Sequence, residues 1–273
     1  MTVADIPFAI KATSLEGWGY TAADFKRMLR LDPHGCLKAV AEGKRVGITT
    51  AASYGEVGWI GNVIVLPRFR GHNIGFWLVD AAIEYLETKG AETVHLNSYF
   101  HTVDFYKGLG FRGEFENVRF HGTLATGTPP EEAASAVSLA DVVRFDERYF
   151  GASRRRLLSS LKREFPNTFI SRGSVGLDGF LVGQVSGTSC EVAPWVCDPR
   201  HPAAVKEMWR ELSNRLPRFE VAFTAPSVSS MAMSFAKRAG MTAGFRTLRM
   251  YQGRKAHGGR PVGILGLGGL EKG

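Results

Sequence analysis

The chain has 273 residues, of which 44% are hydrophobic and 22% are charged, and its formal net charge is +8 at pH 7. These proportions are typical of a globular protein, and the length is sufficient for two modest domains. No apolar run reaches the ~20 residues of a membrane-spanning helix, so we expect no membrane association.

The N-terminal region predicts a helix rather than a targeting signal. Residues 1–10 contain Asp5 and lack both a basic start and an apolar core, so we expect no signal peptide and a cytoplasmic location. Further on, Thr21 and Asp24 have the spacing of a capping box, with the shorter Asp in place of Glu. Two aromatic residues, Trp18 and Tyr20, lie directly before this predicted helix start.

A strand, a turn and a helix are predicted around residue 70. The apolar run Trp59–Leu66 predicts a buried strand, and the turn Pro67–Gly75 follows it. Apolar residues at helical spacing then predict a helix; they are Ile74, Leu78, Ala81, Ala82 and Tyr85. Because the first amides of a helix lack partners within it and face the positive end of its dipole, this turn suits a pyrophosphate.

A second motif follows the predicted strand Thr93–Ser98. It is the run Phe105-Tyr106-Lys107-Gly108-Leu109-Gly110-Phe111. With strand, turn, helix, strand and Phe-Tyr-x-x-x-Gly-Phe in this order, the chain resembles the GNAT superfamily of acyl-CoA-dependent N-acyltransferases. The loop motif of that family is R/Q-x-x-G-x-G/A. Here Arg70, Gly71 and Gly75 form an Arg-Gly-x-x-x-Gly run.

One position departs from the family's loop motif. Asn73 stands where the motif has its middle glycine. Asn adopts a left-handed backbone more readily than most residues, so we expect the loop to keep its shape.

The resemblance implies an N-acetyltransferase that uses acetyl-CoA and no metal. Its fold would be α+β (mixed α/β), with a mostly antiparallel twisted sheet flanked by helices. The loop amides would bind the CoA pyrophosphate, the strand backbone would pair with the pantetheine arm, and the Tyr106 phenol would protonate the departing CoA thiolate. Trp18 and Tyr20 would line the acceptor pocket. The implied cofactor-binding residues are Ile64, Val65, Arg70, Gly71, His72, Asn73, Ile74 and Gly75.

The acceptor amine and the general base stay open at this point. Relatives often place a Glu on the strand before the loop, and this chain has Trp59 at the corresponding place. The alternatives for the base are Glu56, His95, Glu191 and a water relay. A small amine, an amino acid, an antibiotic or a peptide N-terminus could each be the acceptor. The alternative function is a non-catalytic acyl-CoA sensor or interaction module, which the departures from the motif favour and Tyr106 opposes.

The second half of the chain resembles the first at an offset of 130 residues. Aligning Phe105 with Phe235 also brings together other pairs, which are Lys107 and Lys237, Gly110 and Gly240, Phe115 and Phe245, and Arg119 and Arg249. A period this long indicates domain duplication rather than a solenoid. In the second copy Pro202-Ala203-Ala204-Val205 replaces the glycine-containing loop, and Ala236 matches Tyr106. The sequence therefore predicts tandem GNAT-like domains, of which the second is degenerate.

The predicted boundaries follow from turn-forming residues. The catalytic domain would span 1–123, a linker 124–133, the degenerate domain 134–255 and a Gly-rich tail 256–273. That tail is predicted to be a loose end or a final strand broken by glycines. The run Arg154–Arg156 lies in an amphipathic helical pattern without an aromatic platform, so no nucleic-acid partner is expected. Cys36, Cys190 and Cys197 lack metal-ligand spacing, which indicates reduced thiols.

Overall fold

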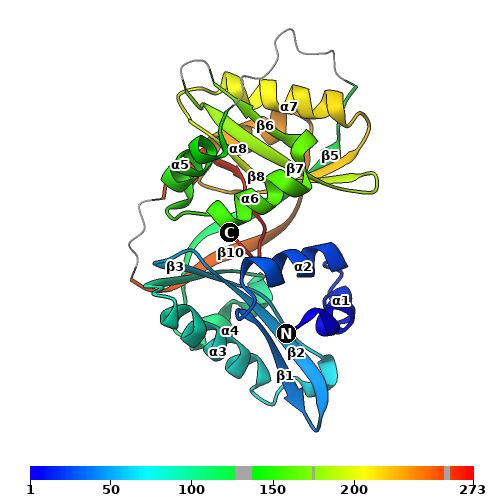
Figure 1. The fold of residues 1–273 in the computed structure, drawn as a ribbon, viewed down its shortest axis with the longest axis vertical. Helices are drawn as coiled ribbons and strands as arrows, with labels where there is room; N and C mark the ends of the chain where they lie inside the picture. The colour runs from blue at the N-terminus through cyan, green and yellow to red at the C-terminus, as the bar shows by residue number, and fades with distance from the viewer. Residues whose placement is uncertain (127–136, 174–175, 255–258) are drawn as a thin grey trace.

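One sheet extends through both halves of the molecule (Figure 1). The computed structural model describes residues 1–126, 137–173, 176–254 and 259–273, so the predicted linker lies outside the described residues from 127 onward. Within these residues eleven strands form the order β1-β2-β3-β4-β10-β5-β9-β8-β7-β6, and β11 pairs with β8. The predicted mixed α/β fold with a mostly antiparallel sheet is confirmed.

The elements have the following bounds. The strands are β1 (Cys36–Ala41), β2 (Lys44–Ser53), β3 (Val57–Val65), β4 (Thr93–Ser98), β5 (Arg112–Thr123), β6 (Phe169–Arg172), β7 (Gly179–Ser186), β8 (Ser189–Cys197), β9 (Glu220–Pro226), β10 (Thr242–Gly253) and β11 (Ile264–Gly266). The helices are α1 (Ile6–Ser14), α2 (Ala22–Leu31), α3 (Ile74–Thr88), α4 (Val103–Gly108), α5 (Leu139–Phe150), α6 (Arg155–Glu164), α7 (Ala203–Arg215) and α8 (Ser230–Arg238). In the part of the chain that the structure describes, none of the helices has the length and apolar character needed to cross a bilayer.

The start of α2 shows why the N-terminal prediction succeeded. The Thr21 side chain accepts a hydrogen bond from the Asp24 amide, and the Asp24 carboxylate accepts one from the Thr21 amide at 2.9 Å. This reciprocal capping box satisfies two amides that the helix itself cannot satisfy.

A bulge in the middle of β3 changes which face of the sheet its side chains point to. Asn62 has a left-handed backbone (φ 51°), and the register with β2 shifts next to it, between Ile48 and Thr50. In a regular strand Ile60 and Ile64 would face the same side of the sheet. Here Ile60 packs in the cluster under α3, whereas Ile64 packs in the cluster formed with α1 and α2. The bulge thus lets Ile60 face α3 and Ile64 face α1 and α2, which lie on the opposite side of β3.

The strand order is symmetric about its centre, in agreement with a duplicated fold. Strands β5 and β10 pair antiparallel, and Asn117 lies opposite Thr247, its own repeat partner 130 residues later. The parallel pairs β3 with β4 and β8 with β9 lie at equivalent places on either side. The predicted repeat therefore corresponds to a pseudo-twofold axis through the middle of the β5–β10 pair.

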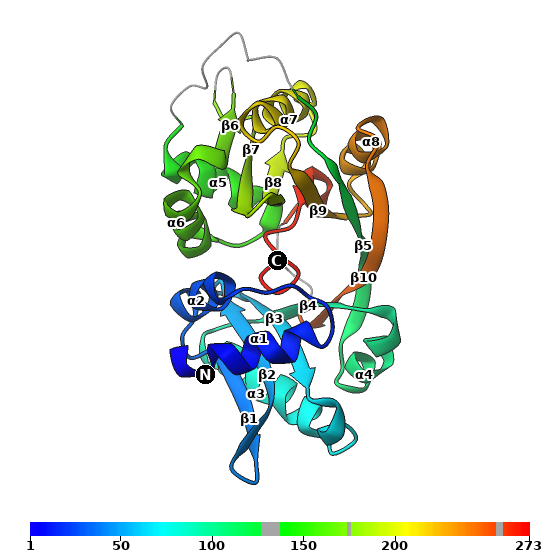
Figure 2. The ribbon, with the colours of Figure 1, turned by 90° about the vertical axis from the view of Figure 1, so that its right-hand side faces the viewer.

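Each half gives its last strand to the other half. Strand β10 of the second half pairs with β4, and β5 of the first half pairs with β9. Figure 2 shows both strands running from the upper to the lower part of the molecule. The two halves therefore share a continuous hydrogen-bonded sheet rather than meeting only through side chains.

Candidate active site

The turn between β3 and α3 presents a group of unpaired backbone amides. Gly71 and Asn73 have positive φ angles of 82° and 57°, and α3 begins immediately afterwards at Ile74. Among the described residues, the amides of Gly71, His72 and Asn73 have no hydrogen-bond partner, and the Trp77 amide donates to the Asn73 carbonyl. These loop amides and the first turn of α3 can together bind an anion at the positive end of the helix dipole. Asn73 adopts the left-handed conformation that the sequence predicts for it.

Arg70 holds this loop against β3. Its Nε donates to the Val65 carbonyl at 3.0 Å, and its guanidinium forms an ion pair with Glu16. The His72 side chain also binds within the loop, because its Nδ1 lies 3.0 Å from the Arg70 carbonyl and donates to it. The guanidinium of Arg70 therefore stabilises the shape of the loop, while the backbone amides remain available.

Strands β3 and β4 separate beside this loop. Their parallel pairing runs from Val57 opposite Thr93 to Trp59 opposite His95 and stops there, although both strands continue. The Leu66 amide donates to Val46 of β2 at 2.8 Å, so by strand alternation the Val65 polar groups face away from β2. The Val65 carbonyl accepts a hydrogen bond from Arg70, which leaves the Val65 amide at the edge of β3 that faces away from β2. The polar groups of Ile64 face β2 instead.

Tyr106 lies on α4 with a free hydroxyl. Its ring packs against Phe105 and Phe111, with centroid distances of 5.0 and 5.9 Å, and the side chain is 9% exposed. The described residues provide no hydrogen-bond partner for this hydroxyl, and burial raises the pKa of the phenol. The phenol therefore stays protonated at neutral pH and keeps a proton to donate.

Trp18 and Tyr20 belong to an aromatic cluster that both halves build. The Trp18 ring stacks on Tyr99 at 6.4 Å and contacts Tyr20 edge-on at 6.5 Å. Phe245 of β10 lies 5.5 Å from Tyr99. We call Trp18, Tyr20, Tyr99 and Phe245 the aromatic wall. Trp18 also packs against the cluster that contains Ile64 of β3, so the Trp18–Tyr99 contact joins the β3 side to the end of β4.

The three candidate bases lie in different surroundings. Glu56 is exposed at the start of β3, at the opposite end of that strand from the loop. His95 is 1% exposed, and its ring stacks on Trp59 at 5.3 Å, with Tyr251 at 6.3 Å. Glu191 of β8 binds Arg119 through two hydrogen bonds of 2.9 and 2.7 Å.

Glu191 is the candidate base that lies beside the aromatic wall. The Arg119 guanidinium is 5.8 Å from the Phe245 ring centre. Burial raises the pKa of Glu191, and the Arg119 charge acts in the opposite direction.

The C-terminal segment reaches the first half at the point where β3 and β4 separate. The Leu270 carbonyl accepts hydrogen bonds from Trp59 Nε1 at 3.0 Å and from Asn97 Nδ2 at 2.8 Å. Tyr54 donates to the Lys272 carbonyl at 2.9 Å. Of the two predictions for the tail, the final strand is confirmed by β11.

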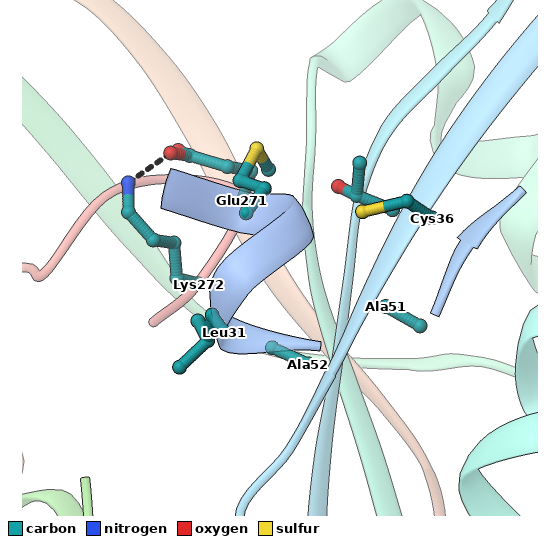
Figure 3. A pocket seen from close by; sticks show the side chains of 8 residues that line it. Leu31, Cys36, Ala51, Ala52, Glu271 and Lys272 are labelled. Atoms are coloured by element: carbon teal, nitrogen blue, oxygen red, sulfur yellow. Dashed lines mark hydrogen bonds and ion pairs between the residues drawn. The ribbon is translucent and has the colours of Figure 1, made fainter. Parts of the chain in front are cut away.

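Glu271 and Lys272 form a buried ion pair within this segment. Together with residues of α2, β1 and β2 they line a small pocket, which Figure 3 shows; its other lining residues are Met28, Leu31, Cys36, Thr50, Ala51 and Ala52. Glu271 also forms a hydrogen bond with Tyr20 of the aromatic wall. Sequence reasoning did not select Glu271, because its place near the site depends on a contact between distant segments.

In the second half the equivalent opening is filled by the chain itself. Strands β8 and β9 pair in parallel as far as Glu191 opposite Ala222, the positions equivalent to Trp59 and His95. Strand β11 then pairs with β8, and the Leu267 amide donates to Thr224 of β9 at 2.8 Å.

The loop that follows β8 also differs from its counterpart. The Asp198 carboxylate accepts hydrogen bonds from the Arg200 amide at 2.9 Å and from the Arg200 guanidinium at 2.7 Å. A carboxylate therefore occupies this loop, where the first half presents free amides. Across the described residues, no group of three or more His, Cys, Asp and Glu side chains is arranged to hold a metal ion.

Comparison with known proteins gives matches over both halves. A family model described as "Acetyltransferase (GNAT) family" matches residues 9–111, and one described as "Acetyltransferase (GNAT) domain" matches residues 142–261. The chain is 22% identical to holothin acyltransferase of Pseudoalteromonas sp. (strain SANK 73390), over 94% of this chain and 88% of that protein.

Solved structures show the same fold. A protein from Pyrococcus horikoshii has a TM-score of 0.82 and 20% identity, with 100% of this chain and 94% of that chain covered. A tandem GNAT protein from the clavulanic acid biosynthesis pathway has a TM-score of 0.63 and 14% identity, with 94% of this chain and 95% of that chain covered.

Proposed function

The chain belongs to the GNAT family of acyltransferases, and from this premise we propose that it transfers an acetyl group from acetyl-CoA to a primary amine. The observation that supports the proposal is the group of unpaired amides in the β3–α3 loop, which lies beside the edge where β3 and β4 separate and the Val65 amide is open. We assign the protonated phenol of Tyr106 to the same opening.

We assign the cofactor to this opening. The amides of residues 71–75 would bind the pyrophosphate, and Arg70 and His72 would hold the loop in shape. The Val65 amide would donate to the pantetheine arm, and the neighbouring Ile64 would keep β3 paired with β2. The site residues predicted from the sequence thus retain a role, although the side chains of Arg70 and His72 act on the loop rather than on the phosphates.

The proposed reaction is a direct attack without a covalent enzyme intermediate. The neutral amine nitrogen attacks the thioester carbonyl, the new C–N bond forms, and the C–S bond breaks. Tyr106 donates its proton to the departing sulfur, and the amine proton passes to Glu191 or to water. Burial raises the pKa of each cysteine thiol to about 12, so these thiols stay protonated and do not serve as nucleophiles at neutral pH.

A small molecule is the acceptor that we propose. Holothin acyltransferase, which matches along nearly the whole of this chain, is named for a compound rather than for a protein substrate. The tandem GNAT protein of similar fold comes from the clavulanic acid biosynthesis pathway. Both observations favour a small-molecule amine over a peptide.

The test of the proposal is Tyr106→Phe, which keeps the packed ring and removes the proton. With acetyl-CoA and a set of small primary amines, free-thiol release should fall roughly a hundredfold or more relative to the unaltered protein. The affinity for CoA, measured by calorimetry, should not change, because the hydroxyl has no partner among the described residues. Near-normal turnover would show that solvent protonates the thiolate. Binding of CoA without turnover of any amine by the unaltered protein would favour the sensor alternative.

A further inference from the structure

The aromatic wall is partly exposed. Phe245 is 42% exposed, and Trp18, Tyr20 and Tyr99 are half-buried. Three of these rings form a connected series, in which Trp18 stacks on Tyr99 and Tyr99 contacts Phe245. Because Trp18 also packs with the Ile64 cluster of β3 and Tyr99 directly follows β4, the series borders the opening between these two strands.

A charged pair made by both halves, Arg119 of β5 and Glu191 of β8, lies at the end of this series. The side chains of Arg119 and Glu191 are 29% and 35% exposed, although they hold each other through two hydrogen bonds. The Arg119 guanidinium lies over the Phe245 ring. The wall is thus aromatic near the β3–β4 opening and ends at Phe245 beside the charged groups of Arg119 and Glu191.

The internal symmetry of the molecule provides a comparison. The repeat partners of Arg119 and Phe245 are Arg249 and Phe115, and Arg249 lies over Phe115 at 5.2 Å, as Arg119 lies over Phe245. In that copy, Trp59 stands at the position of Glu191. It is fully buried and donates to Leu270 of the C-terminal segment, while Arg249 is 4% exposed. The copy around Arg249 and Trp59 is therefore buried, whereas the copy around Arg119 and Glu191 is partly exposed to solvent.

We propose that the acceptor amine carries a planar aromatic ring, which stacks on Trp18, Tyr99 and Phe245 and leaves the amine at the β3–β4 opening, while Arg119 and Glu191 border the ring at Phe245. This inference rests on the proposed acyl transfer and names the substrate class of the same site. A flat ring fits because aromatic side chains gain additional attraction from offset or edge-to-face contacts that a saturated ring of the same size does not make. The acceptor ring would then cover the exposed copy of the arrangement, which contains Arg119, Phe245 and Glu191.

The experiment compares two amines that differ only in the ring. With acetyl-CoA and the full chain, we compare kcat/KM for 2-phenylethylamine and for 2-cyclohexylethylamine, measured by free-thiol release. Contacts with several rings should favour the aromatic amine by about tenfold. Phe245→Leu keeps an apolar side chain and should reduce this ratio toward one, while the KM for acetyl-CoA stays unchanged. Phe100→Leu is the matched control, because Phe100 is 52% exposed and lies outside the wall, and it should leave the ratio unaltered.

The outcomes separate this inference from the function on which it rests. Equal kcat/KM values for the two amines, or a ratio that Phe245→Leu does not change, would overturn the ring preference and leave acyl transfer in place. Absence of thiol release with every amine tested, including simple aliphatic ones, would overturn the proposed function and the ring preference with it.

Discussion

Asn73 is the residue on which the shape of the proposed phosphate loop depends. Its backbone lies in the left-handed region, at φ 57° and ψ 11°, and it directly precedes the first residue of α3. Glycine adopts this conformation freely and Asn tolerates it, whereas a β-branched side chain is strained there. The departure from the family motif is therefore compatible with the loop that the motif normally forms.

This leads to a prediction for two substitutions at one position. Asn73→Val should weaken CoA binding about tenfold or more, because the left-handed conformation costs an L-residue on the order of 1–2 kcal/mol. Asn73→Gly should preserve the affinity and serves as the matched control. Calorimetric titration of both variants with CoA measures the difference. If the Val variant binds as tightly as the Gly variant, the left-handed residue is not needed for the cofactor.

At the scale of elements, motifs of a few consecutive residues predicted the local structure, whereas contacts between distant segments could not be predicted. A few consecutive residues were enough to predict the capping box at Thr21, the β3–α3 turn and the helix that carries Tyr106, and the structure contains all three. The bulge at Asn62 could not be predicted in this way, because an Asn within an apolar run does not by itself indicate a positive φ. The contact of Leu270 with Trp59 and Asn97 joins residues about 170 to 210 positions apart, which no periodicity reveals.

The C-terminal segment should contribute measurably to stability through its fit on β3. An added Cβ at Gly61 would overlap the Cα and Cβ atoms of Glu271. Gly61→Ala should therefore displace the segment and destabilise the protein by about 1–3 kcal/mol, the usual cost of overpacking. At Gly108, near the end of α4, an added Cβ meets no atom within 4 Å, so Gly108→Ala is the control and should be neutral. Thermal unfolding of both variants is the measurement. An unchanged midpoint for Gly61→Ala would mean that the segment is not firmly bound.

At the scale of the whole molecule, the exchange of β5 and β10 makes the two halves dependent on each other. The offset of 130 residues correctly predicted that these strands correspond, but it could not predict that each pairs with the other half. Pairing partners are chosen by long-range packing, and identical strand patterns are compatible with either arrangement. The division of the chain at residues 1–123 and 134–255 stays a prediction, since the hydrogen bonds of three strand pairs cross it, β4–β10, β5–β10 and β5–β9.

The same duplication raises the question of how many cofactor molecules one chain binds, and the structure predicts one. In the second half β11 fills the gap between β8 and β9, and the Asp198 carboxylate occupies the loop that would have to accept a phosphate. Because this carboxylate already accepts from the Arg200 amide, that amide is not available to a phosphate. Calorimetric titration with CoA should therefore give a stoichiometry of one per chain.

A substitution in the first half sharpens this prediction. Gly75→Glu adds a negative charge to the first turn of α3, where the nearest atom to an added Cβ is 3.4 Å away on the Phe105 ring. Because each lost charge-assisted hydrogen bond costs about 1.5–3 kcal/mol, two or three losses should weaken CoA binding at least about a hundredfold. With a single site, no tight binding should remain in a variant whose circular dichroism is unchanged. A stoichiometry of two, or half of the binding retained after this substitution, would show that the second half also holds the cofactor.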